Sequence, residues 1–400
     1  MAGAGSLRLI VVAAVLVSCS TTESPFSPPG PPAYIFISPA DMGLIVGRSD
    51  QFIANAHDAN GRVRSAPFEW SSSDPTIVAI GKTDGRVTAI AKGTATVTVT
   101  SGSISASARV TIVEMSGTLS FTRVDFNNGS YSSDVFSYSA SDGALRPLPR
   151  DSRFQDIAAP TWSPDGALIA LEGITGPMLY DPNSDMIAYP SDVFVANAAA
   201  PSLPWRTLTT SGASRSPSWS PDGNRIAYVE GLPPSRSHIF IIHVSGGAPT
   251  RLTSAEGVYD TPRWSPDGTR LAFANQGSVF IINADGTGLV RVSRSTAEWD
   301  WDPSWSPDGL QLAFVRSKND IGNLMVARLA DLDQPFSALV ASPRTWASAP
   351  VWSPDGRWIA LSLNGEHDRG IYAVSVDGSA KVRLTKSSDH DYDRPSAWTR

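Results

Sequence analysis

Carboxylate, aromatic and basic side chains gather in six short segments of this 400-residue chain, each shortly ahead of a tryptophan. The side chains that we consider as ligand contacts in these segments are Asp156, Arg215, Tyr259, Asp260, Trp299, Asp300, Trp301, Asp302, Trp346, His390, Asp391 and Asp393. Aromatic rings supply contact area and carboxylates orient a ligand, so the mixture suits a basic peptide, a sugar or a cation. The alternative is that the aspartates cap turns and the aromatic rings pack on neighbouring loops.

Residues that could perform catalysis are scarce in the sequence. There is no Gly-x-Ser-x-Gly nucleophile elbow and no ligand spacing typical of a zinc site. The histidines are His57, His238, His243, His367 and His390. His238 and His243 flank one expected strand, and their odd separation places them on opposite faces of it. The sequence therefore predicts no catalytic residue, no bound metal and no cofactor, and a protein that is not an enzyme.

A repeated motif indicates the scaffold that holds these segments. Pro-x-Trp-Ser-Pro-Asp-Gly occurs with its tryptophan at positions 162, 219, 264, 305 and 352, and a degenerate copy ends at Trp398. Each repeat reads as four short strands, which at this spacing is typical of a β-propeller. In the motif, Pro presets φ, Asp bonds turn amides and Gly accepts positive φ, while Trp fills the wedge between blades.

The blade count follows from the two ends of the repeat region. Gly117–Leu148 contains three strands without a tryptophan motif, and Arg394–Trp398 contains a first strand with nothing after it. Together they would complete one blade, which gives six blades and removes an exposed sheet edge. The segments that enter the innermost strands would then line the mouth of the central channel. The longest loop on that side, about 173–191, contains Tyr180, Asp181, Asp185 and Tyr189.

The five near-perfect motif copies resemble the TolB-like propeller, over residues 117–400. If function follows this resemblance, the partner is another protein or peptide of the bacterial envelope that docks at the channel mouth. A rival reading is a glycan-binding or metal-dependent polysaccharide lyase propeller, with the acidic and aromatic ring as its active site.

Residues 34–115 read as a separate unit of short strands. Alternation is strict in Ala95–Thr100, and an Asp84-Gly85 turn joins two apolar runs, which is a strong hairpin signal. About 80 residues of such strands around one Trp70 predict a small β-sandwich. The stretch WSSSDPTIVAIGKTDGRVTAIAKGTATVTVT resembles the bacterial immunoglobulin-like domain of group 2. That resemblance implies a spacer, or an adhesion module as the alternative.

The N-terminus reads as an export signal. Residues 1–18 place Arg8 before an apolar run, and Leu16-Val17-Ser18-Cys19 resembles the bacterial lipobox, in which the cysteine is lipidated. The alternative is a plain signal peptide with a coincidental cysteine, although Cys19 is the only cysteine. Residues 19–33 are rich in proline and predict a semi-rigid tether. Ser20 favours the outer membrane if the enterobacterial sorting pattern applies.

The net charge of −6 makes nucleic acid a poor partner. Taken together, the sequence predicts an all-β protein, an immunoglobulin-like β-sandwich followed by a six-bladed β-propeller. We expect a monomeric, membrane-anchored envelope lipoprotein, periplasmic or surface-facing, whose propeller binds a protein or peptide. The identity of the ligand, the orientation of the anchor and the binding of a cation in the channel stay open.

Overall fold

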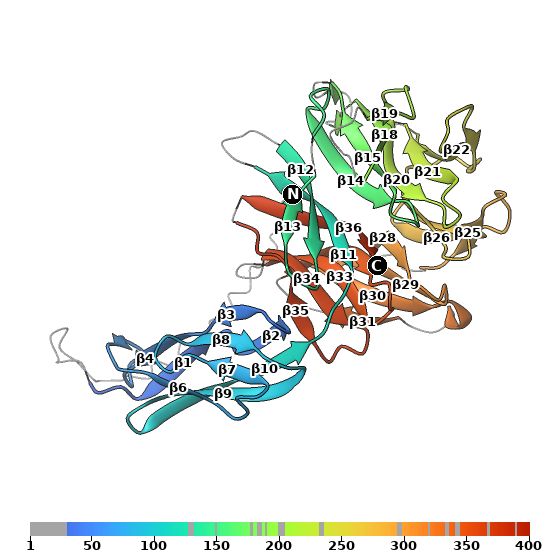
Figure 1. Ribbon diagram of the computed structural model, residues 1–400. Coiled ribbons are helices and arrows are strands. Elements are labelled where there is room, and N and C mark those ends of the chain that lie inside the picture. The colour runs from blue at the N-terminus through green and yellow to red at the C-terminus, as the bar shows by residue number, and fades with distance from the viewer. Residues whose placement is uncertain are drawn as a thin grey trace, which may run out of the picture.

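The computed structural model contains two β-domains arranged side by side (Figure 1). It describes residues 30–126, 132–148, 150–176, 179–181, 186–188, 190–198, 205–231, 236–293, 298–318, 321–332, 336–340, 345–365, 369–388 and 390–400. Within these residues the helical structure is a 3₁₀ turn, Leu329–Asp331, and no helix is long and apolar enough to span a membrane. The predicted signal peptide, Cys19 and most of the tether lie outside the described residues.

The first domain is the predicted β-sandwich. Its strands are β1 (Tyr34–Ser38), β2 (Asp41–Ile45), β3 (Ser49–Gln51), β4 (Ile53–His57), β5 (Val63–Arg64), β6 (Glu69–Ser72), β7 (Val78–Ile80), β8 (Arg86–Ala89), β9 (Gly93–Ser101) and β10 (Ile104–Val113). They form sheets in the orders β1-β4-β5, β2-β10-β9-β6 and β3-β8-β7. The expected hairpin at Asp84-Gly85 is present as β7 and β8, with Gly85 at φ +69°. Trp70 and Phe52 stack in the core.

The second domain is a six-bladed propeller, as predicted. From the inside outward its blades are β14 (Asp156–Trp162), β15 (Leu168–Ile174), β18 (Ser191–Asn197), β19 (Arg206–Thr207); β20 (Ser214–Trp219), β21 (Arg225–Glu230), β22 (His238–His243), β23 (Thr250–Arg251); β24 (Tyr259–Trp264), β25 (Arg270–Asn275), β26 (Ser278–Asn283), β27 (Val290–Arg291); β28 (Trp299–Trp305), β29 (Gln311–Lys318), β30 (Ile321–Arg328), β31 (Ser337–Val340); β32 (Thr345–Trp352), β33 (Trp358–Gly365), β34 (Arg369–Ser375), β35 (Lys381–Arg383); and β36 (Asp391–Thr399), β11 (Thr118–Asp125), β12 (Ser132–Ser139), β13 (Leu145–Pro147).

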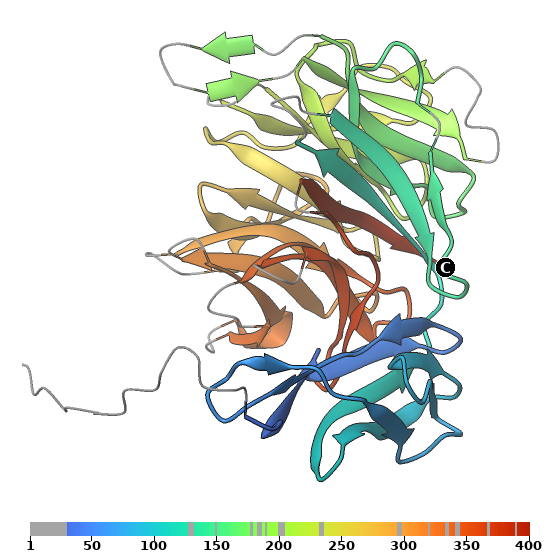
Figure 2. The ribbon, with the colours of Figure 1, turned by 90° about the vertical axis from the view of Figure 1, so that its left-hand side faces the viewer.

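The two ends of the repeat region close the ring. β36 pairs antiparallel with β11, from Thr118 opposite Thr399 to Asp125 opposite Asp391. Successive inner strands contact one another around the ring, including β36 with β14. Figure 2 shows the dark red β36 beside the green strands of the first blades. Closure by the C-terminal strand is therefore the arrangement that the incomplete first and last repeats required.

The motif residues occupy the structural roles expected for them. Trp219, for example, packs with Ala170 and Val195 of the preceding blade and with Ile226 and Tyr228 of its own blade. Its indole N–H also donates to the Thr161 carbonyl across the blade boundary, over 3.2 Å. The wedge role is thus shown directly by the packing.

Each Ser-Pro-Asp-Gly turn is held by its aspartate. In the third blade, the Ser265 hydroxyl and the Thr269 amide both donate to Asp267, over 2.6 and 3.0 Å. Together with the Thr269 hydroxyl, these bonds hold the pKa of Asp267 at about 2. The five turn glycines all have φ near +70°. Because the carboxylates serve the turns, these aspartates have a structural purpose.

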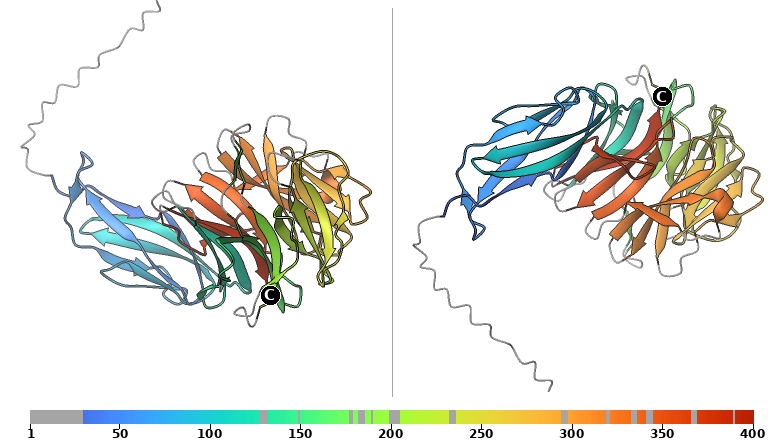
Figure 3. Two further views of the ribbon diagram at one scale, coloured as in Figure 1. Left: turned by 90° about the horizontal axis from the view of Figure 1, so that it is seen from above. Right: turned by 90° about the horizontal axis from the view of Figure 1, so that it is seen from below.

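The sandwich docks on the blade formed by β32–β35, on the side of the Ser-Pro-Asp-Gly turns. Ile45, Val113 and Met115 share one hydrophobic cluster with Trp358 and Val382 of the propeller. Asp50 accepts a hydrogen bond from Arg383 across the boundary, over 2.9 Å. Figure 3 shows the blue and cyan sandwich against the red blade. The two domains therefore share part of their core.

Candidate functional site

The inner strands all begin on one face of the propeller, which we call the mouth, and five of them bulge soon after entering. At each of these bulges one residue that is not glycine has φ near +50°: Ala159, Ser216, Thr261, Asp302 and Ala349. In the closing strand the corresponding position is Pro395, whose ring forbids positive φ, and the pairing of β36 with β11 shifts register there instead. Such strained positions cluster where a fold aims side chains at a site.

Three tryptophans lie at the mouth, Trp299 and Trp301 on β28 and Trp346 on β32. Trp299 is 68% exposed, and its ring lies over Gly277, where an added Cβ would come within 3.1 Å of the indole. Trp301 and Trp346 meet edge to face with ring centroids 5.3 Å apart. Trp346 also pairs with Gly322 at the end of the neighbouring blade's hairpin. The structure thus brings Trp301 and Trp346 into contact and leaves Trp299 open to solvent.

Several of the predicted acidic residues are occupied inside the fold. Asp300 is buried and accepts two hydrogen bonds from Arg316, over 2.8 and 3.0 Å. Asp393, also buried, accepts two from Arg123, over 2.6 and 2.7 Å. These hydrogen bonds raise the pKa of both arginines. Both pairs join directly opposed residues on neighbouring strands, so they secure the blades.

Two further predicted residues have structural partners. Asp156 is buried, which raises its pKa, and it accepts the Ser133 amide of the adjoining blade over 2.6 Å. Tyr259 is buried against Phe273, its hydroxyl donates to the Ala255 carbonyl, and burial raises its pKa. We therefore leave Asp156, Tyr259, Asp300 and Asp393 out of the ligand-contacting set.

Charged side chains further along the inner strands balance one another across the channel. Arg394 donates to Asp302 over 2.8 Å, and the charge of Asp302 is the main reason that the pKa of Arg394 is raised. Arg215 lies 3.9 Å from Asp260, whose side chain is half exposed. Arg263 has its pKa lowered by burial, although Asp302 and Asp260 oppose that shift. The channel is therefore lined by both signs of charge.

The closing segment presents the remaining predicted residues. His390 is exposed, and its carbonyl accepts the Phe126 amide over 3.0 Å. Asp391 is partly exposed opposite Asp125. Phe126 itself is 55% exposed at this edge of the mouth and was missed by the sequence argument.

The long loop between β15 and β18 contains a small hairpin, β16 (Leu179–Asp181) and β17 (Met186–Ala188). Figure 2 shows this hairpin projecting beyond the blades. Tyr180 and Asp181 are in it, whereas Asp185 and Tyr189 lie outside the described residues.

In the described ranges, no group of three His, Cys, Asp or Glu side chains is arranged to hold a metal ion. His238 contacts Tyr259, while His243 bonds Ser245 at the far end of the same strand. His367 falls outside the described ranges.

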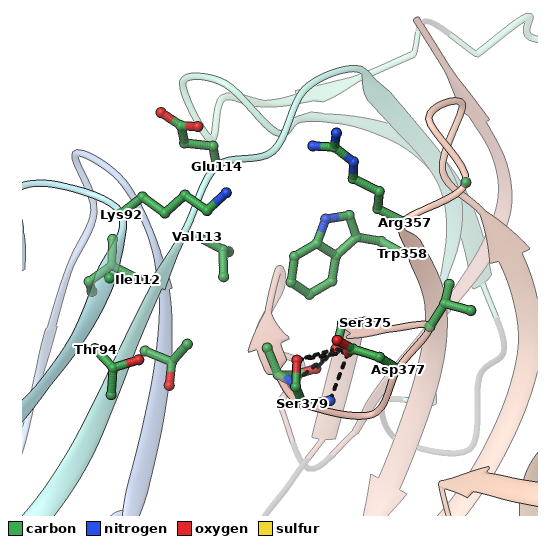
Figure 4. A pocket seen from close by; sticks show the side chains of 15 residues that line it. Lys92, Thr94, Ile112, Val113, Glu114, Arg357, Trp358, Ser375, Asp377 and Ser379 are labelled. Atoms are coloured by element: carbon green, nitrogen blue, oxygen red, sulfur yellow. Dashed lines mark hydrogen bonds between the residues drawn. The ribbon is translucent and has the colours of Figure 1, made fainter.

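A cavity of about 590 Å³ lies between the domains and away from the mouth. Figure 4 shows Trp358 and Arg357 on the propeller side facing Lys92, Ile112 and Val113 on the sandwich side. Asp377 in its wall is held by Ser375 and Ser379. We regard this cavity as the crevice that remains where two convex domains dock.

Comparisons with known proteins agree with both predicted domains. The model of the bacterial Ig-like domain (group 2) matches residues 34–112, and that of the TolB beta propeller domain matches residues 206–322. No curated protein sequence gives a significant match.

Solved structures share the fold at low sequence identity. TolB from Acinetobacter baumannii is 13% identical, with 92% of this chain and 99% of that chain covered and a TM-score of 0.57. A putative TolB from Agrobacterium tumefaciens is 16% identical, with 70% and 98% covered and a TM-score of 0.50. Hydrazine synthase from Kuenenia stuttgartiensis is 13% identical, with 71% and 47% covered and a TM-score of 0.54. Because propellers support unrelated activities, these likenesses concern the fold. The chain carries a bacterial immunoglobulin-like domain of group 2 followed by a TolB-like β-propeller.

Proposed function

We propose that this protein is a cell-envelope lipoprotein whose propeller binds a protein or peptide partner at the mouth, without catalysing a reaction. The observation that carries the proposal is the 68% exposure of Trp299 at the mouth, on the same inner strand as Trp301, which contacts Trp346. A large aromatic side chain left in water is costly, and aromatic residues of this kind commonly anchor protein interfaces.

The polar surroundings fit a peptide or protein segment. His390, Asp391 and the half-exposed Asp260 supply hydrogen-bonding groups on or next to other strands that enter at the mouth. Deeper in the channel, Arg263 donates to the Pro262 carbonyl and forms no ion pair within 4 Å in the described part of the chain, so its guanidinium is placed to donate to an acidic group of the partner. A partner with an apolar surface for the tryptophans and an acidic group for Arg263 would contact the mouth and the channel together.

The placement of the sandwich supports this use of the mouth. The sandwich contacts the turn side of the blade formed by β32–β35, through Val113 and Met115 against Trp358. The mouth is on the opposite face of the propeller. A spacer that docks in this way leaves the mouth uncovered.

The partner can be identified by photocrosslinking in cells that produce the full chain. A photoreactive phenylalanine analogue replaces Trp299, and the control variant carries it at Leu310. Leu310 is 65% exposed on the same blade but lies in the turn on the opposite face. We expect a discrete adduct from position 299 alone. Equal adducts from both positions, or none from 299, would contradict binding at the mouth.

The lipid anchor is tested separately, at Cys19. We expect Cys19→Ser to leave the mature protein in the soluble fraction or to leave the precursor uncleaved. A variant that is still cleaved and fully bound to membranes would show that Cys19 is not the site of lipidation.

A further inference from the structure

The sheet β1-β4-β5 has an unusually apolar outer side, which we call the apolar face. Side chains alternate along β1, so that Ile35 packs in the sandwich core while Tyr34 and Phe36 point outward. Tyr34 is 47% exposed, Phe36 57%, Ile53 61% and Val63 63%. Exposure of this size at several neighbouring positions is not explained by packing within the domain.

The register of the strands makes these residues one continuous surface. Tyr34 is opposite His57, which is opposite Val63, and Ser38 is opposite Ile53. The Tyr34 and His57 rings stack, with centroids 5.2 Å apart and an angle of 6°. Phe36 lies between these rows, opposite Asn55. The exposed apolar area is on the order of 400 Å², the size of the largest apolar patch on a typical monomer, which is often functional.

The outward residues of these rows carry no carboxylate, ammonium or guanidinium group: they are Tyr34, Phe36, Ser38, Ile53, Asn55, His57 and Val63. The core of a protein–protein interface is also depleted in charged side chains, so the occupant of this face is decided by the tether that precedes it and by the basic border of the face. A face of aromatic and aliphatic side chains with neutral polar neighbours is suited to the boundary between lipid headgroups and acyl chains.

We propose that the apolar face docks on the surface of a lipid bilayer. The sequence between Cys19 and Tyr34 is 14 residues long and rich in proline, and extended at about 3.1 Å per residue it spans roughly 43 Å. A lipid attached at Cys19 therefore keeps this face within reach of the membrane. That the face lies near a membrane thus rests on the proposed lipid anchor, whereas the apolar composition of the face does not depend on it.

The end of the face nearest the propeller adjoins a groove of about 440 Å³. Ser38 and Ile53 line one wall, and basic residues Lys381, Arg383 and Lys386 line the other, with Asp41 and Asp50 between. Three basic and two acidic side chains leave this border with a small positive excess. Anionic headgroups would be favoured there over zwitterionic ones.

The test uses the chain from Ser20 to Arg400, which contains both folded domains and lacks Cys19. Flotation is measured with phosphatidylcholine vesicles that contain about one third phosphatidylglycerol. The test variant is Phe36→Ser with Ile53→Ser, and the matched control is Leu289→Ser with Leu310→Ser, which changes propeller residues that are 55% and 65% exposed. Melting temperatures check that both variants stay folded.

We expect the unmodified chain and the control variant to float, and the Phe36→Ser, Ile53→Ser variant to float at least fivefold less. The proposal is overturned if the unmodified chain stays at the bottom, or if the face variant floats like the control. It is also overturned if sedimentation shows that the face holds a dimer together and vesicles bind nothing. Because Cys19 is absent, none of these results depends on lipidation.

Discussion

Trp398 in the closing strand is the residue on which closure of the propeller can be tested by a single substitution. It is 8% exposed and packs with Leu119 and Phe121 of the first strands and with Ile371 of the last complete blade. Its indole N–H donates to the Ser116 carbonyl over 3.1 Å. Trp398→Ala therefore removes a wedge between the two ends of the repeat region and leaves one carbonyl without its partner.

The expected loss follows from these contacts. Large-to-small substitutions of buried tryptophan cost about 3–5 kcal/mol, and the lost hydrogen bond adds about 1 kcal/mol. At about 2–4 °C per kcal/mol for a domain of this size, the melting temperature should fall by about 10 °C or more. Thermal unfolding followed by near-ultraviolet circular dichroism measures this change.

The control is Trp299→Ala, because Trp299 is 68% exposed and buries little of its ring. Its melting temperature should stay within about 1 °C of that of the unmodified protein. A Trp398→Ala protein that melts at the temperature of this control would refute closure through the last strand.

Three further perturbations test other parts of the account. Ala159→Gly should raise the unfolding midpoint slightly and Ala159→Val should lower it, since φ is +49° there; the reverse order in urea titrations would argue against strain at the bulges. The pKa of Asp267 is about 2, below its value in the unfolded chain, so its stabilisation is present above pH 4 and is lost as the pH falls towards 2. Asp267→Asn should therefore lose less stability than the unmodified protein between pH 4 and pH 2, and parallel curves would contradict this assignment. Met115→Ala should lower stability by about 2 kcal/mol, because Met115 joins the core shared by the two domains, and an unchanged melting temperature would show that the domains are not coupled there.

The repeated motif made most of the propeller predictable. Tryptophan, proline, aspartate and glycine at fixed spacing fix the turn, the first strand and the blade wedge, because each acts through contacts within a few residues. The closing blade could be inferred too, since three strands without an inner partner and one inner strand without a blade complete each other. The sandwich followed from alternation and the Asp84-Gly85 turn in the same local way.

The candidate site was less predictable because its residues are defined by distant partners. Asp393 is neutralised by Arg123, 270 residues away in the sequence. Counting outward from the turn at Asp308 would have placed Asp300 opposite Ser317, because the bulge between Trp301 and Ser304 that brings Asp300 opposite Arg316 shifts the strand register by one residue. The contact between the sandwich and Trp358 could not be predicted, because the residues near Trp358 in the sequence do not indicate which domain covers it.

The most direct test of binding at the mouth uses the partner identified by crosslinking. Its affinity is measured for two variants of the full mature protein and compared with that for the unmodified protein. Trp299→Ala removes the exposed ring at the mouth, and Leu310→Ala removes an equally exposed side chain from the opposite face of the same blade. Truncation of an anchoring tryptophan costs about 2 kcal/mol or more of binding free energy. Trp299→Ala should therefore raise the dissociation constant measured by calorimetry about thirtyfold. Leu310→Ala should bind as the unmodified protein does. Equal affinities for the two variants would contradict the mouth as the binding site.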